Sequence, residues 1–162
     1  MLILNTGGTF NKRYNPISGE LEVPYDNLAV EKILSTFSST VEVAGVIYKD
    51  SLDMDTEDRK TIAQIISASH ERFFVVIHGT DTMHLSALFL DAVLEDKVVI
   101  FTGAMVPFEI DPVEATANLA MALGFAKAQN APGVYICMQG LVAKHDKIVK
   151  NRALGKFEIV ED

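Results

Sequence analysis

Short apolar runs alternate with longer amphipathic segments along the 162-residue chain. The runs are rich in β-branched and aromatic residues, lack a regular polar–apolar alternation, and occupy residues 2–4, 41–47, 73–77, 98–101 and 134–138. Strands buried on both faces of a parallel sheet have this pattern. Each run is therefore predicted to be a strand of a sheet that is covered on both sides.

Four segments between these runs carry apolar residues at the i, i+3, i+4 spacing of an amphipathic helix. The predicted buried stripes are Val30, Ile33, Leu34 and Phe37; Ile62, Ile65 and Ile66; Leu85, Leu88, Phe89 and Val93; and Ala115, Leu119, Ala122, Leu123 and Ala126. Asp81 or Thr82 could cap the third helix. Alternating strands and helices predict a three-layer α/β fold, Rossmann-like or flavodoxin-like, with a mostly parallel sheet and helices on both faces.

Two segments depart from this rhythm. Residues 10–24 are polar and contain turn signals at Asn15-Pro16 and Ser18-Gly19, which are compatible with a β-hairpin or with a mobile flap over a site. Residues 143–162 form a charged tail that is too short for a further domain and contains Lys144, Lys147, Lys150, Arg152 and Lys156. We therefore expect a single domain over residues 1–162.

Charge and composition limit the class of partner. The chain has 14 Lys and Arg residues against 22 Asp and Glu residues, a formal net charge of −8. Phosphate backbones and anionic lipids repel such a protein, so we expect neither nucleic acid nor a membrane as partner. The start of the chain lacks the basic region of a secretory signal, which favours a cytoplasmic location. The single cysteine, Cys137, lies in a predicted buried strand and is expected to be an inert small hydrophobe.

Small and polar residues follow four successive predicted strands, as Thr6-Gly7-Gly8-Thr9, Ser51-Leu52-Asp53, His78-Gly79-Thr80-Asp81-Thr82 and Thr102-Gly103-Ala104-Met105. Ligands of parallel sheets bind beyond the carboxyl ends of the strands, so these loops predict a ligand site. For any single loop, helix capping and turn formation are the simpler explanation. The fingerprints of a dinucleotide site, a P-loop and an α/β-hydrolase are absent from the sequence, as is a His-x-x-x-His zinc pair.

Taken together, the loops resemble the N-terminal domain of the bacterial-type L-asparaginases. The resemblance runs from residue 1 to about residue 150 and rests on Thr6-Gly7-Gly8-Thr9-Phe10, Ser51-Leu52-Asp53-Met54, His78-Gly79-Thr80-Asp81-Thr82-Met83, Asp96-Lys97 with Thr102-Gly103-Ala104-Met105-Val106-Pro107, and Asn118-Leu119. It implies hydrolysis of the side-chain amide of L-asparagine, and often of glutamine, to the acid and ammonia. No cofactor and no metal are expected.

The resemblance also implies a role for each of several residues. Thr9 matches the threonine assigned as nucleophile, and Thr80, Asp81 and Lys97 match the second threonine and its partners. Tyr14 is the candidate for the family's flap tyrosine, with Tyr25 as second choice. The expected substrate-binding residues, including those for the α-carboxylate and α-ammonium groups, are Gly8, Ser51, Thr80, Asp81 and Ala104.

Two departures from the family pattern keep an alternative open. Family enzymes have a second, C-terminal domain, which completes the site of a neighbouring subunit, and this chain is expected to contain the N-terminal domain only. The family's Ser-Gln pair reads Ser51-Leu52, which removes a polar substrate contact. We predict an amidohydrolase that forms a homodimer or homotetramer, partly through the small-residue helix at 115–128. The alternative is a non-catalytic amino-acid-binding module or a degenerate asparaginase-like module.

Overall fold

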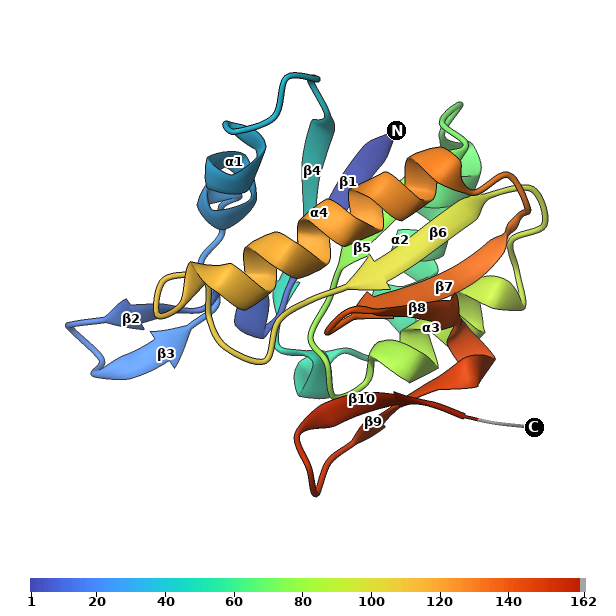
Figure 1. The fold of residues 1–162 in the computed structure, drawn as a ribbon. Coiled ribbons are helices and arrows are strands. Elements are labelled where there is room, and N and C mark those ends of the chain that lie inside the picture. The colour runs from blue at the N-terminus through green and yellow to red at the C-terminus, as the bar shows by residue number, and fades with distance from the viewer. Residues whose placement is uncertain (161–162) are drawn as a thin grey trace.

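A six-stranded sheet forms the centre of the computed structural model, which describes residues 1–160 (Figure 1). The strand order is β4-β1-β5-β6-β7-β8, with β1 at Leu2–Gly7, β4 at Glu42–Lys49, β5 at Phe73–Ile77, β6 at Val98–Thr102, β7 at Gly133–Met138 and β8 at Leu141–Lys144. The first five are parallel and β8 runs antiparallel to β7. These five parallel strands are the five predicted apolar runs.

Helices cover both faces of this sheet (Figure 1). Helices α1 (Leu28–Leu34) and α4 (Pro112–Ala128) pack on one face, and α2 (Thr56–Ala68) and α3 (Met83–Asp91) pack on the other. Each face has its own cluster of buried apolar side chains. The predicted three-layer α/β fold is therefore confirmed.

The strand order places a topological switch between β1 and β5. The chain leaves β1 toward β4 on one side, and it leaves β5 toward β6 on the other. Where neighbouring parallel strands send their connections in opposite directions, a crevice opens at their carboxyl ends. Here the loops that begin with Gly7 and His78 flank that crevice.

The predicted buried stripe of the third helix is wrong for three of its four residues. Leu85, Leu88 and Val93 are 45%, 58% and 52% exposed, whereas Phe89 packs against the core and Leu90 is fully buried. The buried side of α3 also contains Ser86, whose hydroxyl lies 2.8 Å from Nε2 of the buried His78. Because α3 has apolar residues on several sides, a buried polar contact fixes its orientation, and apolar periodicity alone does not reveal it.

The stripe of small residues on α4 is buried as predicted, but it has a different role. Ala115, Ala122 and Ala126 are fully buried and pack with the sheet of the same chain. The argument that this stripe offers a surface between subunits is therefore wrong. The oligomeric state itself stays a prediction.

Both irregular segments contain hairpins. The first has a 3-10 turn, Thr9–Asn11, followed by β2 (Arg13–Asn15) paired with β3 (Glu20–Glu22). The predicted charged tail folds into a 3-10 turn, His145–Lys147, and a hairpin of β9 (Ile148–Asn151) and β10 (Lys156–Ile159). Residues 161 and 162 of that tail lie outside the described residues.

Cys137 lies on β7 and is fully buried, as expected of a small hydrophobe. Burial raises the pKa of its thiol to about 12. Among residues 1–160, none of the helices combines the length and the apolar character needed to cross a bilayer.

The orientation of α3 can be tested with two leucines of the same helix. Leu90→Ala should lower the free energy of unfolding by about 2 to 5 kcal/mol, because it leaves a cavity in the core. Leu88→Ala should change it by about 0.5 kcal/mol or less, because the side chain is 58% exposed. Urea denaturation measures both values, and equal losses in the two variants would contradict the described orientation.

Candidate active site

Three glycines let the loops after β1, β4, β5 and β6 meet at the carboxyl edge of the sheet. A Cβ atom on Gly8 would lie 2.4 Å from the backbone nitrogen of Gly79. One on Gly79 would lie 2.6 Å from Cβ and Oγ of Ser51, and one on Gly103 would lie 2.4 Å from the carbonyl oxygen of His78. No side chain larger than hydrogen fits at these positions without moving its neighbour. The four predicted loops therefore form one contiguous group.

This packing brings the two predicted threonines to the same edge. Thr9 follows Gly8, and Thr80 follows Gly79, the residue on which Gly8 packs. Thr80 is 5% exposed, and Thr9 is partly exposed at the start of its 3-10 turn. Within residues 1–160 the structure records no hydrogen bond for the Thr9 hydroxyl, so it is free to contact a ligand.

Ser51, a predicted substrate-binding residue, lies on the short turn Ser51–Asp53 and is 1% exposed. Its hydroxyl has no hydrogen-bond partner among the described residues. Its carbonyl oxygen accepts a hydrogen bond of 2.6 Å from the Thr82 hydroxyl, so Thr82 ties two loops together instead of capping α3. A buried hydroxyl without a partner is costly, which indicates a position that a ligand satisfies.

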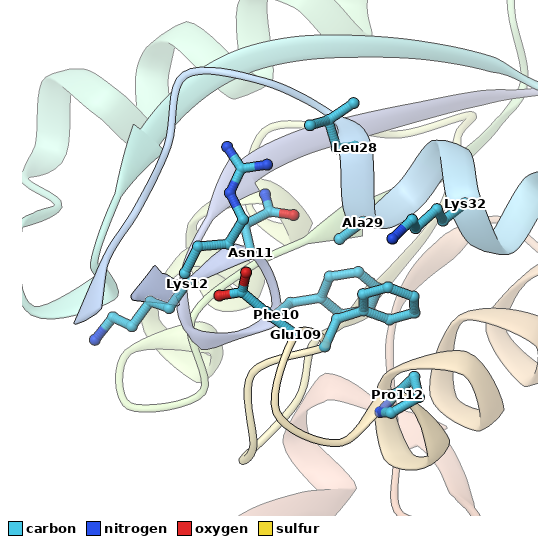
Figure 2. Close-up of a pocket in the computed structure, with 10 residues that line it drawn as sticks. Phe10, Asn11, Lys12, Leu28, Ala29, Lys32, Glu109 and Pro112 are labelled. Atoms are coloured by element: carbon cyan, nitrogen blue, oxygen red, sulfur yellow. The ribbon is translucent and has the colours of Figure 1, made fainter. Parts of the chain in front are cut away.

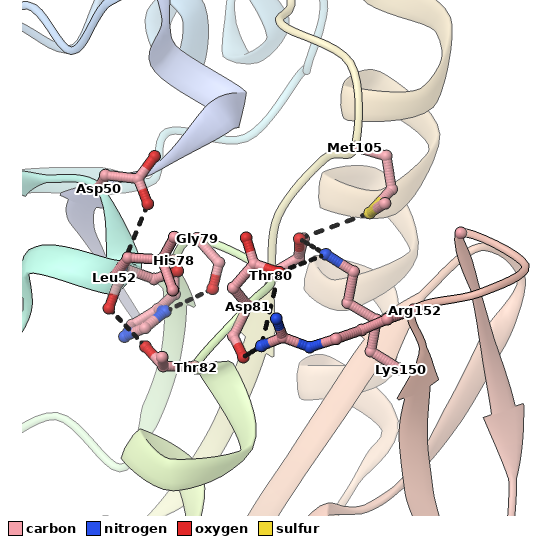
Figure 3. Close-up of polar contacts among 12 residues, drawn as sticks. Asp50, Leu52, His78, Gly79, Thr80, Asp81, Thr82, Met105, Lys150 and Arg152 are labelled. Atoms are coloured by element: carbon pink, nitrogen blue, oxygen red, sulfur yellow. Dashed lines mark hydrogen bonds and ion pairs between the residues drawn. The ribbon is translucent and has the colours of Figure 1, made fainter.

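Lys150 completes a cluster around Thr80 and Asp81 (Figure 3). Its Nζ atom donates hydrogen bonds to Thr80 Oγ1 at 2.8 Å and to Asp81 Oδ1 at 3.0 Å. The Arg152 guanidinium lies 3.7 Å from the same carboxylate oxygen and donates to the Asp81 carbonyl at 3.0 Å. Both cations come from the β9–β10 hairpin, which returns to the sheet edge. A hydroxyl, a carboxylate and two cations are thus assembled from distant parts of the chain.

The expectation that Lys97 lies beside Thr80 is wrong. Lys97 directly precedes β6, at the amino end of the parallel strands, and its Nζ donates to the carbonyl oxygens of Ser69 and Glu71, each at 2.9 Å. The carboxyl edge that carries Thr80 is the opposite edge of the sheet. Sequence reasoning counted Lys150 only as part of a charged tail. The signal for it was the apolar pair Ile148-Val149, which indicates a short strand able to return a lysine to the sheet.

The two candidate tyrosines are exposed. Tyr14 lies on β2, is 60% exposed, and its backbone nitrogen donates to Glu109 Oε2 at 3.0 Å. Tyr25 is 85% exposed, with its ring centroid 5.4 Å from that of Tyr48. Among the described residues, the structure records no contact between either ring and the two threonines. Ala104 is fully buried in the loop after β6.

A buried histidine supports the loop that carries Thr80. Nδ1 of His78 lies 2.8 Å from the Gly79 carbonyl oxygen and therefore carries the proton (Figure 3). Nε2 then accepts from the Ser86 hydroxyl at 2.8 Å, and that hydroxyl accepts from Arg59 Nε at 3.1 Å. Complete burial lowers the pKa of His78 to about 4. The neutral imidazole suits this chain of bonds, which runs in one direction from Arg59 to Gly79.

An ion pair also links the segment after β1 to the loop after β4. Lys12 Nζ lies 2.5 Å from Asp50 Oδ2, and Asp50 Oδ1 accepts from the backbone nitrogen of Leu52 at 3.1 Å. Burial alone would raise the pKa of Asp50, but these bonds outweigh it and hold the pKa below its ordinary value. Asp50 is therefore a fixed anion that orients the Ser51 turn.

The close approach at Gly79 gives a stability prediction. Gly79→Ala should lower the free energy of unfolding by about 1 to 3 kcal/mol, because the new methyl group meets the Ser51 side chain and backbone. Gly124→Ala is the matched control, since a Cβ there has no neighbour within 4 Å and alanine favours the interior of α4 by about 1 kcal/mol. Urea denaturation that showed no loss for Gly79→Ala would contradict the packing.

The buried His78 predicts a pH dependence of stability. Below pH 6.5 the unfolded chain takes up a proton here that the folded protein does not accept until about pH 4. The contribution of His78 to the free energy of unfolding is therefore fully present above pH 6.5. It falls by about 3 kcal/mol as the pH decreases to 4. Unfolding free energies measured across this window should show a clearly shallower slope for His78→Asn than for the wild type, whereas the exposed control His70→Asn should match the wild type. Part of the slope should remain in His78→Asn, because burial also lowers the pKa of His84. Equal slopes in His78→Asn and the wild type would contradict the assignment.

Comparison with known proteins shows the family to which the chain belongs. The sequence matches the family model "Asparaginase, N-terminal" over residues 1–157. It is 26% identical over 160 residues to the L-asparaginase of Thermococcus kodakarensis, a match that covers 96% of this chain and 48% of the relative. It is also 37% identical over 105 residues to the 60 kDa lysophospholipase of Homo sapiens, covering 62% of this chain and 18% of that protein.

Solved structures agree with these matches in fold. The thermostable L-asparaginase from Thermococcus kodakarensis gives a TM-score of 0.85 at 24% identity, covering 98% of this chain and 50% of the other. L-asparaginase I from Vibrio cholerae gives 0.77 at 27% identity, covering 98% and 50%. The chain thus spans about half the length of the Thermococcus and Vibrio asparaginases. Because the family model covers nearly all of its length, the chain belongs to the asparaginase family and corresponds to that family's N-terminal domain.

Proposed function

We propose that this chain carries the catalytic centre of an amidohydrolase that converts L-asparagine to aspartate and ammonia. The observation that carries the proposal is the contact of the Lys150 ammonium with both Thr80 Oγ1, at 2.8 Å, and Asp81 Oδ1, at 3.0 Å, at the carboxyl edge of the sheet. Membership of the asparaginase family supports the choice of an amide substrate. Relatives named L-asparaginase support asparagine in particular, and glutamine is proposed as a second substrate.

Thr9 is the proposed nucleophile. Its Oγ1 would attack the side-chain amide carbon of the substrate, and collapse of the tetrahedral intermediate would expel ammonia and leave an ester on Thr9. Attack by water on that ester then releases aspartate and restores the hydroxyl. The absence of a recorded hydrogen bond to Thr9 within residues 1–160 supports this role, because the hydroxyl need not break an internal contact first.

Thr80 and Lys150 would assist this attack. The Asp81 carboxylate accepts from the Lys150 ammonium at 3.0 Å, an opposite-charge contact that a neutral amine would not make. We therefore assign Lys150 a charged role: it polarises Thr80 Oγ1, which relays protons and stabilises negative charge on the reacting oxygen.

The substrate's backbone groups have proposed partners in the adjoining loops. The unpaired, buried Ser51 hydroxyl would donate to the α-carboxylate, and Asp81 would accept from the α-ammonium. Gly8 and Ala104 would border the bound substrate through their backbones, and Tyr14 would reach it by movement of the β2–β3 hairpin. Leu52 is 65% exposed where the family pattern has a polar side chain, so one substrate contact is lost.

We further propose that the chain folds as a single domain and acts as a homodimer or homotetramer in the cytoplasm. A structural neighbour from Campylobacter jejuni, described as a probable cytoplasmic L-asparaginase, supports the location. The exposed apolar side chains of α3, Leu85 and Leu88, offer area for subunit contact.

Ammonia release from L-asparagine, L-glutamine and related amides tests the proposed activity. Thr9→Ala and Thr80→Val should each lower turnover by about a hundredfold or more. Lys150→Met should do the same, whereas Lys97→Met, at the opposite edge of the sheet, should retain turnover within a factor of about three. Circular dichroism of each variant separates a lost reaction from a lost fold.

The outcomes distinguish catalysis from binding. A folded wild-type protein that releases no ammonia from any amide would overturn the proposal. A melting temperature that nonetheless rises with L-aspartate would then identify an amino-acid-binding module, since a ligand of the native state stabilises it. Loss of turnover in Lys97→Met with retention in Lys150→Met would overturn the assignment of the lysine.

A further inference from the structure

A cavity of about 430 Å³ lies behind the segment that carries Thr9, between the 3-10 turn Thr9–Asn11, α1 and the loop before α4 (Figure 2). This volume is within the range of small-molecule sites. Its apolar wall consists of Phe10, Leu28, Ala29, Phe108 and Pro112. None of the residues that contact Thr80 or Asp81 lines it, so it is separate from the proposed active site.

Asn11 provides an unpaired acceptor in this cavity. The backbone nitrogen of Gly7 donates to Asn5 Oδ1 at 3.1 Å, and Asn5 Nδ2 donates to Asn27 Oδ1 at 2.9 Å, which fixes the orientation of the Asn5 amide. Asn11 must therefore direct its own Nδ2 to Asn5 Oδ1. Its Oδ1 atom remains without a partner among residues 1–160, although the side chain lines the cavity and the residue is only 3% exposed. A buried carbonyl oxygen of this kind lacks the donor it needs, and a small shift of the side chains that cover it would open it to a donor in the cavity.

Charges of both signs border the apolar wall. Lys12 and Arg13 are already held in ion pairs with Asp50 and Asp26. Lys32 lies on α1 with its ammonium directed toward the cavity, and the structure records no ion pair for it within residues 1–160 (Figure 2). The Glu109 carboxylate also lines the cavity, with Oε2 accepting from the Tyr14 backbone and Oε1 left over. The Lys32 ammonium and the Glu109 carboxylate therefore lie on opposite sides of the apolar wall (Figure 2).

We propose that this cavity binds a free α-amino acid with an aromatic or large aliphatic side chain. The apolar side chain packs against Phe108 and Leu28, and the α-carboxylate pairs with Lys32. The α-ammonium donates to Asn11 Oδ1 and Glu109. A zwitterion with an apolar group satisfies all four features at once, whereas a hydrocarbon would leave Asn11 unpaired and an inorganic anion would leave the apolar wall unfilled.

The cavity adjoins the turn that carries the proposed nucleophile, but none of the proposed active-site residues lines it. Phe10 directly follows Thr9, and its carbonyl oxygen accepts a hydrogen bond of 3.2 Å from the Phe108 nitrogen. The ligand would therefore lie against the back of the turn whose front bears the Thr9 hydroxyl.

Isothermal titration calorimetry of L-phenylalanine into the full chain tests the proposal. We expect saturable binding that is weakened about tenfold or more in Lys32→Gln and in Ala29→Leu, which fills the cavity. The matched controls are Lys60→Gln, a lysine on α2 outside the cavity, and Thr80→Val in the proposed active site, and both should bind as the wild type does. Phenylacetate, which lacks the ammonium group, and phenethylamine, which lacks the carboxylate, should each bind about tenfold more weakly or worse.

Three results would overturn the proposal: no saturable binding of L-phenylalanine, displacement of it by L-aspartate, or undiminished binding in Lys32→Gln. Ala29→Leu is interpreted only if circular dichroism shows it to be folded. Lys32 is exposed on α1, so its variant decides the matter in any case. The outcome is independent of catalysis, because a chain that releases no ammonia can still bind the amino acid in this cavity.

Discussion

The contact between the backbones of Gly8 and Gly79 is the constraint on which the rest of the site depends. The two loops leave neighbouring parallel strands, and hydrogen side chains alone let them meet at this distance. The hydroxyls of Thr9 and Thr80 then lie at one edge because each residue follows one of these glycines. The switch in strand order opens the crevice, and the glycines determine how closely its walls approach.

Much of this architecture follows from the sequence. Four of the five apolar runs form the inner strands β1, β5, β6 and β7, which need apolar residues throughout because both of their faces are covered. The run at residues 41–47 forms β4 at the edge of the sheet, where Ile47 is the one buried residue of the strand, so the expectation of a strand buried on both faces was wrong there. The loops after those strands also proved to be neighbours, as the rule for parallel sheets requires. The face of α3 was not predictable in this way, because the buried Ser86 that fixes it is polar and its partner, His78, lies eight residues away in sequence.

The lysine of the site shows the limit of sequence reasoning more clearly. The resemblance selected Lys97 from the Asp96-Lys97 segment, yet a residue that directly precedes a parallel strand lies at the amino edge, away from the crevice. Lys150 reaches Thr80 only because β9 and β10 fold back beneath the sheet edge, a long-range arrangement that charge and periodicity in the tail do not specify. The chemistry of each loop could be predicted from its own residues. The contacts of Lys150 with Thr80 and Asp81, which lie 70 and 69 positions away, could not.

The β9–β10 hairpin follows all six strands of the main sheet along the chain, and it therefore leaves the ribosome after them. All six strands of the main sheet lie before residue 145, so the sheet can assemble while the segment that carries Lys150 and Arg152 is still inside the ribosome. The nascent chain would then present both threonines and the Asp81 carboxylate with no cation beside them. The two cations reach Thr80 and Asp81 only when the hairpin docks, so a chain interrupted before residue 150 would lack the contacts on which the proposed reaction depends.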